Sequence, residues 1–451
     1  MDALIILFAS GILTMFISLL KKPVLSLITA SAGLFIAGSL LVLNFDHPLN
    51  FIKYEGLIFD SASVLFSLTI VVFTLLLTLS GYAYFSKEKD HTGDYMALML
   101  FSATGALCMV SFSDLFMFFI GLEILSIPVY VLAGTKKKDL RSTEASIKYF
   151  FTGAFATGVL LFGIAMIYGA TGTFKIAEIE AFINTNDTLP SFLHVGILLM
   201  LASFLFKVGA VPFHFWSPDV YEGSPSVMTG YMAAVVKFAG FIAFFKLFSV
   251  AFGGASDYWA PILIVVAIAS MFLGNLSAIQ QTQFKRLIAY SSITHVGYAL
   301  LAILSFNSLL NVQSLWIYLF SYGFSIVVLL SVSMLIKQED DSIASLKGLA
   351  RKYPFIGFVA ILALLSMAGI PPLFGFFGKY MVFSRAFGAY PMLVIIAIIN
   401  SGIGIYYYLR TIIVMLSEND QESMIKTPHV LHYLVLSICA IALMVGGFVF
   451  V

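Results

Sequence analysis

Residues 205–214 read LFKVGAVPFH and lie inside a long apolar stretch, yet they include a lysine, a glycine, a proline and a histidine. A glycine and a proline in such a run interrupt a helix, because proline lacks the backbone N–H that helical hydrogen bonding needs. A second interruption, AGIPPLFGFFGK, occupies residues 368–379. Lys207 precedes the first break and Lys379 follows the second. The two breaks predict discontinuous helices in an internally duplicated chain.

The composition around these breaks is typical of a membrane protein. The chain has 451 residues, of which 61% are hydrophobic and 10% are charged, and its mean hydropathy is +1.02. Apolar stretches of about 20 residues, the length that spans a bilayer as a helix, recur along the whole chain. We therefore predict an all-α integral membrane protein with about 14 transmembrane helices. The first apolar segment lacks a basic start and a small-residue cleavage site, which favours a retained helix over a signal peptide.

The spacing of the two breaks predicts how the chain is organised. The broken spans, expected at residues 191–213 and 354–388, are five spans apart, and an odd repeat length places the two copies in opposite membrane orientations. We predict two inverted five-helix repeats, residues 94–250 (spans 4–8) and residues 251–416 (spans 9–13). An N-terminal three-helix segment (1–93) precedes them and a C-terminal helix (417–451) follows.

The distribution of loop lysines and arginines predicts the orientation. With this assignment of spans, one side of the membrane collects most of them, whereas the other side has only Lys53, Lys175 and Arg385. The side rich in basic residues is normally cytoplasmic. Both termini are therefore predicted to lie on the periplasmic side of a bacterial inner membrane.

Ionisable residues inside the predicted spans are the candidates for function. Glu123 is the one carboxylate near the centre of a span, and Lys207, Lys237 and Lys379 cannot easily reach an interface. A buried charge is costly unless it is neutralised or paired, and a buried lysine can lose its proton near neutral pH. One glutamate among several lysines predicts a pair that controls lysine protonation. The alternative is a structural ion pair that holds helices together.

Two histidines and a further lysine accompany this group. His295 lies within a span beside hydroxyl residues, and Lys285 lies ten residues earlier, about 15 Å along an ideal helix. A proton route between them would need water or hydroxyl groups, and the alternative for His295 is a packing residue. His214 follows the first break, where it is expected either to bind freed backbone carbonyls or to act as a gate. Asp219 and Glu222 nearby are expected to be solvated or to cap helices.

Motifs for bond-making chemistry are missing from the sequence. It has no phosphate-binding glycine loop after a strand, no nucleophile elbow and no cluster with metal-ligand spacing. Cys108 and Cys439 fall in separate spans, which argues against an iron–sulfur cluster or a disulfide framework. The pattern instead indicates transfer of an ion through a helical bundle.

Several long segments resemble the antiporter-like subunits of respiratory complex I. They are FFIGLEILSIPVYVLAG, EASIKYFFTGAFATGVLLFGIAMIYGATGTF, FKVGAVPFHFWSPDVYEGSP, FKRLIAYSSITHVGYALLA and AGIPPLFGFFGKY, and the resemblance extends from about residue 58 to residue 416. The first two segments are most similar to the N-type branch. Lys379, where M-type chains would carry a glutamate, and the lack of the long C-terminal extension of L-type chains also favour that branch.

The resemblance implies roles for individual residues. Glu123 would be the glutamate of the fifth span, and Lys207 would be its partner on the broken seventh span. Lys237 would connect this pair to the second half of the subunit. The proton path would continue through Lys285 and His295 and would end at Lys379 on the broken twelfth span.

The resemblance also implies cofactors and partners. The chain would translocate protons without cofactor chemistry of its own, while NADH, FMN, iron–sulfur clusters and quinone would bind to other subunits. Its partners would be the A-, H-, J-, K-, L- and M-type membrane-arm subunits and the lipid bilayer, and not nucleic acid. The alternatives are a subunit of a multisubunit sodium/proton antiporter without redox coupling, a structural scaffold, and a hydrogenase-linked membrane arm.

Overall fold

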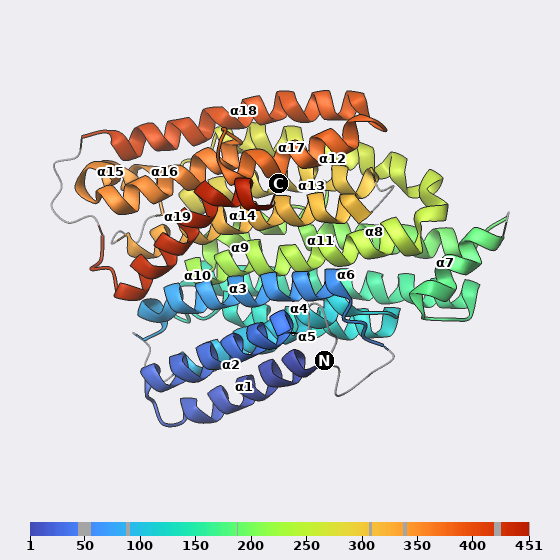
Figure 1. Ribbon diagram of the computed structural model, residues 1–451, viewed down its shortest axis with the longest axis horizontal. Coiled ribbons are helices and arrows are strands. Elements are labelled where there is room, and N and C mark those ends of the chain that lie inside the picture. Colours follow the sequence, from blue (N-terminus) through green and yellow to red (C-terminus); the bar gives the residue numbers. More distant parts are fainter. Residues whose placement is uncertain are drawn as a thin grey trace. The chain divides into compact units, whose positions relative to one another are not determined.

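The computed structural model describes residues 1–43, 56–86, 91–186, 188–305, 309–336, 341–418 and 425–450 (Figure 1). Regular secondary structure in these ranges is helical, and extended contacts are limited to isolated bridges such as that between Asp114 and Lys175. Lys53, one of the residues used to predict orientation, lies outside the described residues.

Helices that can span a membrane dominate the described chain. Twelve helical segments are long and apolar enough to cross a bilayer, and two shorter apolar helices cover Asp2–Ser18 and Pro354–Ala368. The second of these is the first half of a predicted broken span. The predicted all-α membrane fold is thus confirmed, while the total of 14 spans stays a prediction.

The chain folds as two compact units, each assembled from separate segments. The first unit contains Met1–Lys137, Ser146–Val208 and Val235–Ile262, and the second contains Lys138–Ala145, Gly209–Ala234 and Leu263–Val451. This division differs from the repeat boundaries predicted from the sequence, which stay a prediction.

The first unit contains most of the N-terminal helices. Its helices are α1 (Asp2–Ser18), α2 (Pro23–Leu43), α3 (Ser61–Phe85), α4 (Thr92–Ser111), α5 (Leu115–Ala133), α7 (Ile176–Thr185), α8 (Ser191–Val208), α11 (Lys237–Phe245), the π-helix η2 (Lys246–Ala251) and the 3₁₀ helix η3 (Gly253–Ala255). Figure 1 shows α1 and α2 side by side in dark blue, and the two helices pack directly on each other. Three elements have residues in both units: α6 (Leu140–Thr171), the π-helix η1 (Met232–Val236) and α12 (Ser256–Ile279).

The second unit contains the remaining helices. They are α9 (Trp216–Gly223), α10 (Ser226–Tyr231), α13 (Phe284–Leu304), α14 (Leu309–Leu335), the 3₁₀ helix η4 (Ile343–Leu346), α15 (Leu349–Lys352), α16 (Pro354–Ala368), α17 (Phe374–Phe387), α18 (Pro391–Leu416) and α19 (Val430–Phe450). Helix α14 packs against α16, α17 and α19, so the second broken helix has a long neighbour along both of its halves.

The two helix breaks share one local geometry. Helix α8 ends before Gly209 and α16 ends before Gly369, and these glycines have φ values of +74° and +82°. This left-handed conformation reverses the chain at a helix end, and glycine adopts it without the steric cost of a Cβ atom. Pro212 and Pro372 follow three residues later, each after a cis peptide bond. This shared geometry agrees with the internal duplication expected from the sequence.

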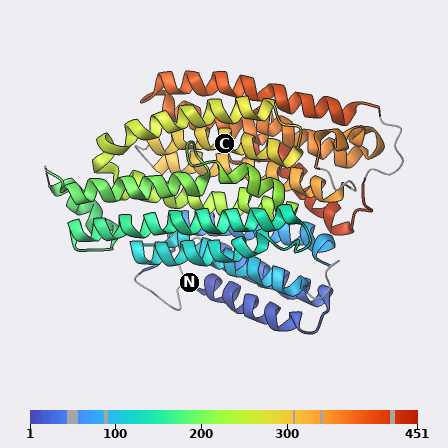
Figure 2. The ribbon, with the colours of Figure 1, turned by 180° about the vertical axis from the view of Figure 1, so that it is seen from behind.

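Hydroxyl groups and small residues hold the helices around α5 and α8 close together. A Cβ atom on Gly105 of α4 would lie 2.2 Å from the Leu125 nitrogen of α5, so this approach requires glycine. Ser102 of α4 donates a hydrogen bond to the Leu125 carbonyl at 2.8 Å. On the other side, Ser203 of α8 donates to the Ala156 carbonyl of α6 at 2.9 Å, and these two helices run side by side in Figure 2. Such close contacts suit helices that pack without a hydrophobic driving force between them.

Candidate functional site

Glu123 lies in the middle of α5. The helix begins after Asp114, whose side chain accepts a hydrogen bond from the Met117 N–H at 2.7 Å and caps the helix. Pro128 follows Glu123 in the same helix and donates no backbone hydrogen bond. The Oε1 atom of Glu123 is buried and has no hydrogen-bond partner among the described residues. The carboxylate therefore retains the capacity to accept a hydrogen bond from a cationic partner.

Lys207 extends from α8 to the same part of α5. The residue is in the last turn of α8 and is 7% exposed, and its Nζ donates to the Ser126 hydroxyl at 2.5 Å. Ser126 in turn donates to the Leu122 carbonyl. Lys207 is within electrostatic reach of Glu123, which lies one helical turn from Ser126. The first unit thus brings the two predicted partners near each other, with a serine as the hydrogen-bond acceptor of the ammonium.

Lys237 is the first residue of α11 and follows the π-helix η1 directly. Its side chain is buried, with 5% exposed. Gly240, one turn further along α11, faces Lys207: a Cβ atom there would lie 3.6 Å from the Lys207 Cγ atom. Helices α5, α8 and α11 therefore bring three of the predicted site residues into one part of the first unit. Sequence reasoning did not predict the π-helix, a distortion that occurs often at functional sites.

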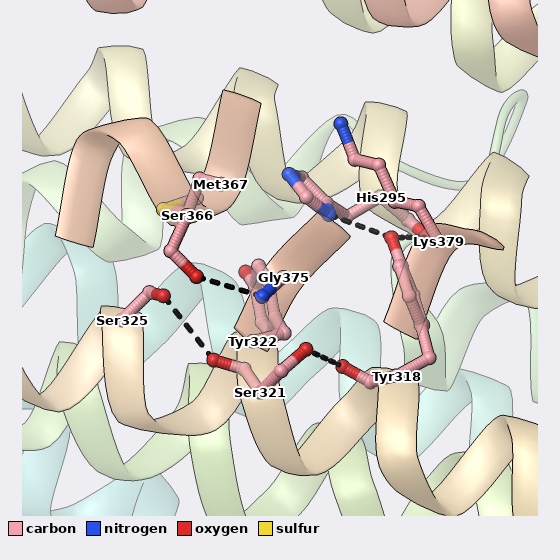
Figure 3. Close-up of a pocket in the computed structure, with 9 residues that line it drawn as sticks. All are labelled: His295, Tyr318, Ser321, Tyr322, Ser325, Ser366, Met367, Gly375 and Lys379. Atoms are coloured by element: carbon pink, nitrogen blue, oxygen red, sulfur yellow. Dashed lines mark hydrogen bonds between the residues drawn. The ribbon is translucent and has the colours of Figure 1, made fainter. Parts of the chain in front are cut away.

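His295 lies on α13 in the second unit and forms hydrogen bonds at both ring nitrogens, of which Figure 3 shows the one to Tyr318. Its Nδ1 atom is 2.6 Å from the Tyr318 hydroxyl on α14, and its Nε2 atom is 3.1 Å from the Tyr408 hydroxyl on α18. The side chain is 5% exposed. The Tyr408 hydroxyl is also 2.5 Å from the Ser291 hydroxyl, so a hydroxyl chain leads to the imidazole.

Lys379 is held by the second helix break. Its Nζ atom donates to the Ala368 carbonyl at 3.0 Å and to the Ser401 hydroxyl at 2.9 Å. Ala368 is the last residue of α16, where carbonyl groups lack partners within the helix. The ammonium also lies 5.2 Å from the centre of the Tyr298 ring, within cation–π distance. The break therefore supplies an acceptor to the lysine that the sequence places beside it.

His295 and Lys379 line the same cavity. The residues that line this small cavity are His295, Tyr318, Ser321, Tyr322, Ser325, Ser366, Met367, Gly375 and Lys379. Figure 3 shows that Tyr318 and His295 meet at one end of this group, with the aliphatic part of Lys379 beside them. The second unit therefore brings together two of the predicted path residues with several hydroxyl groups.

Lys285 occupies a different environment from that of His295. Its Nζ atom pairs with the Asp341 carboxylate at 2.8 Å and donates to the Glu222 and Ser224 carbonyls at 2.7 Å and 2.9 Å. Ser224 is the C-cap of α9. A cation at this position satisfies carbonyl groups that the helix leaves unpaired. Its predicted place on the proton path stays a prediction.

Arg286 forms ion pairs that sequence reasoning missed. The guanidinium donates to Asp219 at 2.8 Å and to Glu222 at 3.0 Å, so both carboxylates of α9 pair with α13. Asp219 and Glu222, expected to be solvated or capping residues, are partly exposed and both pair with this arginine. The adjacent basic residues of α13 and the acidic residues after the first break were the available sequence signal.

His214 lies between the first break and α9. The residue is 4% exposed, and its Nδ1 atom is buried without a hydrogen-bond partner among the described residues. Its ring centre is 4.4 Å from that of Phe215, and its carbonyl accepts from the Ser217 N–H. The predicted gate role for His214 stays a prediction.

Lys246 and the two cysteines complete the description of the buried polar groups. The Nζ atom of Lys246 donates to the Phe112 carbonyl at the end of α4 and lies 4.7 Å from the Phe112 ring centre. Cys108 and Cys439 are buried free thiols. Within the part of the chain that the structure describes, no group of three or more histidine, cysteine or acidic side chains is arranged to hold a metal ion.

The fold and the site define a multi-pass helical membrane protein with buried lysines at broken helices. The model of one protein family, described as NADH:quinone oxidoreductase/Mrp antiporter, TM, matches residues 113–447. The chain therefore belongs to this family of membrane subunits.

Curated relatives are similar over most of their length. NADH-quinone oxidoreductase subunit N of Cytophaga hutchinsonii is 39% identical over 430 residues, which cover 94% of this chain and 92% of the relative. The subunit N of Flavobacterium johnsoniae is 37% identical over 380 residues, which cover 82% of this chain and 81% of the relative.

Solved structures support the same fold. A chain of respiratory complex I from Thermus thermophilus with bound aureothin matches with a TM-score of 0.85 and 28% identity, covering 99% of this chain and 98% of that one. A chain of the Mrp complex from a Dietzia species matches with a TM-score of 0.85 and 19% identity, covering 98% and 92%, and shows the fold alone.

Proposed function

We propose that the buried lysines and His295 carry protons in an N-type, antiporter-like subunit of a proton-translocating NADH:quinone oxidoreductase. The observation that supports the proposal best is the setting of Lys207 and Lys379. Both ammonium groups are buried beside helix breaks, and both donate to serine hydroxyls. A serine hydroxyl oxygen accepts a hydrogen bond from an ammonium and also from a neutral amine, which still carries hydrogens, so it accommodates both protonation states.

The first unit suggests how a proton is loaded and released. Glu123 is close enough to Lys207 to interact electrostatically, while the Lys207 hydrogen bond goes to Ser126. In the proposed cycle, approach of Glu123 keeps Lys207 protonated, and its withdrawal favours release of the proton because burial disfavours the charged form. Movement of one elementary charge across 100 mV requires about 2.3 kcal/mol, a scale that changes in pairing of buried charges can supply.

The proposed path continues from Lys237 through Lys285 and His295 to Lys379. Its last part is supported by the cavity that His295 and Lys379 share. Lys285 is included because of the family resemblance, since its contacts alone fit a helix cap. The driving force is proposed to come from quinone chemistry on another subunit, which moves charge next to Glu123.

The proposal extends to the assembly. The chain is proposed to have both termini on the periplasmic side, to contain inverted repeats at residues 94–250 and 251–416, and to bind A-, H-, J-, K-, L- and M-type subunits. NADH, FMN, iron–sulfur clusters and quinone are proposed to bind elsewhere in that assembly. Purification under mild conditions should yield NADH-oxidising and quinone-binding subunits together with this chain. Purification with only antiporter subunits would favour the non-redox alternative.

Proton translocation by complexes in sealed vesicles tests the path itself. Lys207→Ala and Glu123→Ala should each lower proton uptake driven by NADH oxidation, with the complex still assembled. Ser203→Ala is a matched control, because it removes a buried α8 hydroxyl that binds an α6 carbonyl away from this pair. Wild-type proton uptake in both test variants would exclude the proposed path. Lys237→Met addresses the scaffold alternative, which predicts that this neutral, volume-matched variant retains function.

A further inference from the structure

We propose that Tyr318 and Tyr408 are positioning residues that hold His295 in the Nδ1–H tautomer, with Nε2 as the proton acceptor. The inference rests on the proposed function of His295 and specifies how its two ring nitrogens are used. Each ring nitrogen of His295 is hydrogen-bonded to a tyrosine from a different helix, Tyr318 on α14 and Tyr408 on α18.

The Tyr318 hydroxyl decides which nitrogen carries the hydrogen. This hydroxyl lies 2.6 Å from His295 Nδ1 and 3.2 Å from the His295 backbone carbonyl. A carbonyl oxygen only accepts hydrogen bonds, and a phenol has one hydrogen to donate. When Tyr318 donates to the carbonyl, its oxygen accepts from the imidazole, so Nδ1 carries the hydrogen. Figure 3 shows the Tyr318 hydroxyl placed between these two groups of His295.

The opposite nitrogen then has a defined role. A neutral imidazole has one donor and one acceptor nitrogen, so Nε2 accepts a hydrogen bond from Tyr408 at 3.1 Å. Because the single hydrogen of Tyr408 points to Nε2, the Ser291 hydroxyl donates to the Tyr408 oxygen at 2.5 Å. The hydrogen bonds therefore run in one direction, from Ser291 through Tyr408 to His295 and from there to Tyr318.

Aromatic packing keeps the imidazole in this orientation. The His295 ring lies 4.9 Å from the Tyr322 ring centre, 5.7 Å from that of Tyr298 and 5.9 Å from that of Tyr318. In a close-packed interior, a ring enclosed in this way turns over only if its neighbours move. The tyrosines thus fix both the orientation and the tautomer, with the accepting nitrogen toward Ser291 and the donating nitrogen toward the cavity that Lys379 also lines.

The test combines nitrogen spectroscopy with proton translocation in the intact complex. Complexes are prepared with ¹⁵N-labelled histidine, and the His295 signals are assigned as those missing from the His295→Gln complex. The wild type should show a protonated Nδ1 and an unprotonated Nε2. Tyr318→Phe removes the acceptor for Nδ1–H, so the tautomer should change to Nε2–H, which then donates to the Tyr408 oxygen. Tyr408→Phe should keep the Nδ1–H tautomer and shift the Nε2 signal. Tyr95→Phe is the control for loss of a buried tyrosine hydroxyl, because Tyr95 lies on α4 in the first unit, where it packs against Phe85.

The functional readout is compared with His295→Gln. Tyr318→Phe and Tyr408→Phe should lose most of the NADH-driven proton uptake that His295→Gln loses, while Tyr95→Phe should retain it. An Nε2–H tautomer in the wild type, or an unchanged tautomer in Tyr318→Phe, would overturn the inference. Full uptake in both tyrosine variants beside a defective His295→Gln would also overturn it. If the tautomer behaves as expected but His295→Gln translocates protons normally, the positioning inference holds and the proposed function of His295 fails.

Discussion

Lys207 donates its hydrogen bond to Ser126, one helical turn from Glu123, so the ammonium can exchange a neutral partner for a charged one by a small movement. Ser126 also donates to the Leu122 carbonyl, which fixes its hydroxyl as an acceptor for the lysine. This arrangement makes Ser126 the residue that competes with Glu123 for Lys207.

Removal of the competing hydroxyl should bias Lys207 toward Glu123. Ser126→Ala leaves a buried ammonium without its acceptor, a loss typically worth about 1–3 kcal/mol. We expect Ser126→Ala to lower NADH-driven proton uptake, and Ser126→Thr, which keeps a hydroxyl, to restore most of it. Ser203→Ala again serves as the control. Equal uptake by Ser126→Ala and the wild type would show that the serine does not influence Lys207.

Lys379 should tolerate no permanently charged replacement. Lys379→Arg keeps the positive charge and the hydrogen-bonding capacity, but a guanidinium does not release its proton in proteins. If Lys379 carries protons, the arginine variant should be as defective in proton uptake as Lys379→Met. Arg385→Lys, an exposed change on the same helix, controls for substitution in α17. Normal uptake by Lys379→Arg would assign the lysine an electrostatic role instead.

The glycine at the second break should matter for the position of Lys379 as well as for the backbone. Alanine at Gly369 or Gly209 would adopt a left-handed conformation, at a cost of about 1–2 kcal/mol for a residue with a side chain. At Gly369 the added Cβ atom would also lie 2.9 Å from the Lys379 Cδ atom, whereas at Gly209 the nearest atom is 3.7 Å away. Both variants should melt at lower temperature. Gly369→Ala should lose more proton uptake per assembled complex than Gly209→Ala, and a reversed order would contradict this account.

The two adjacent basic residues of α13, Lys285 and Arg286, should contribute unequally to the stability of the protein. Lys285 is buried and satisfies Asp341 and two carbonyls, whereas the Arg286 contacts are partly exposed. Partly exposed ion pairs typically contribute about 0.2–1 kcal/mol each, and loss of one partner of a buried pair costs about 3–5 kcal/mol. Thermal melting of the purified complex should therefore show a larger decrease in Tm for Lys285→Met than for Arg286→Met. An unchanged Tm for Lys285→Met, together with lost proton uptake, would favour its predicted place on the path over a capping role.

Much of the site was predictable because a charge in an apolar run is conspicuous. Glu123, Lys207 and Lys379 were identified from their positions in predicted spans, and the structure places each at a helix centre or a helix break. The breaks were predictable for the same reason, since glycine and proline have defined effects on a helix.

The hydrogen-bond partners were not predictable from local sequence. Ser126 is 81 residues from Lys207 along the chain, and Tyr408 is 113 residues from His295. Serines and tyrosines are common in these spans and do not reveal which of them face a charged group. The contacts of Lys285 were missed for a related reason, because Asp341 lies on a separate segment whose position depends on tertiary packing.

The neutral partners of Lys379 have an electrical consequence. The Ala368 carbonyl and the Ser401 hydroxyl do not titrate in the physiological range, so they cannot offset a change in the charge of the lysine. Each proton bound at Lys379 therefore adds a full positive charge at a position inside the protein. If this position lies within the field of the membrane, the voltage acts directly on the occupancy of the site. The fraction of Lys379 that is protonated should then change with the membrane voltage against which the complex moves protons.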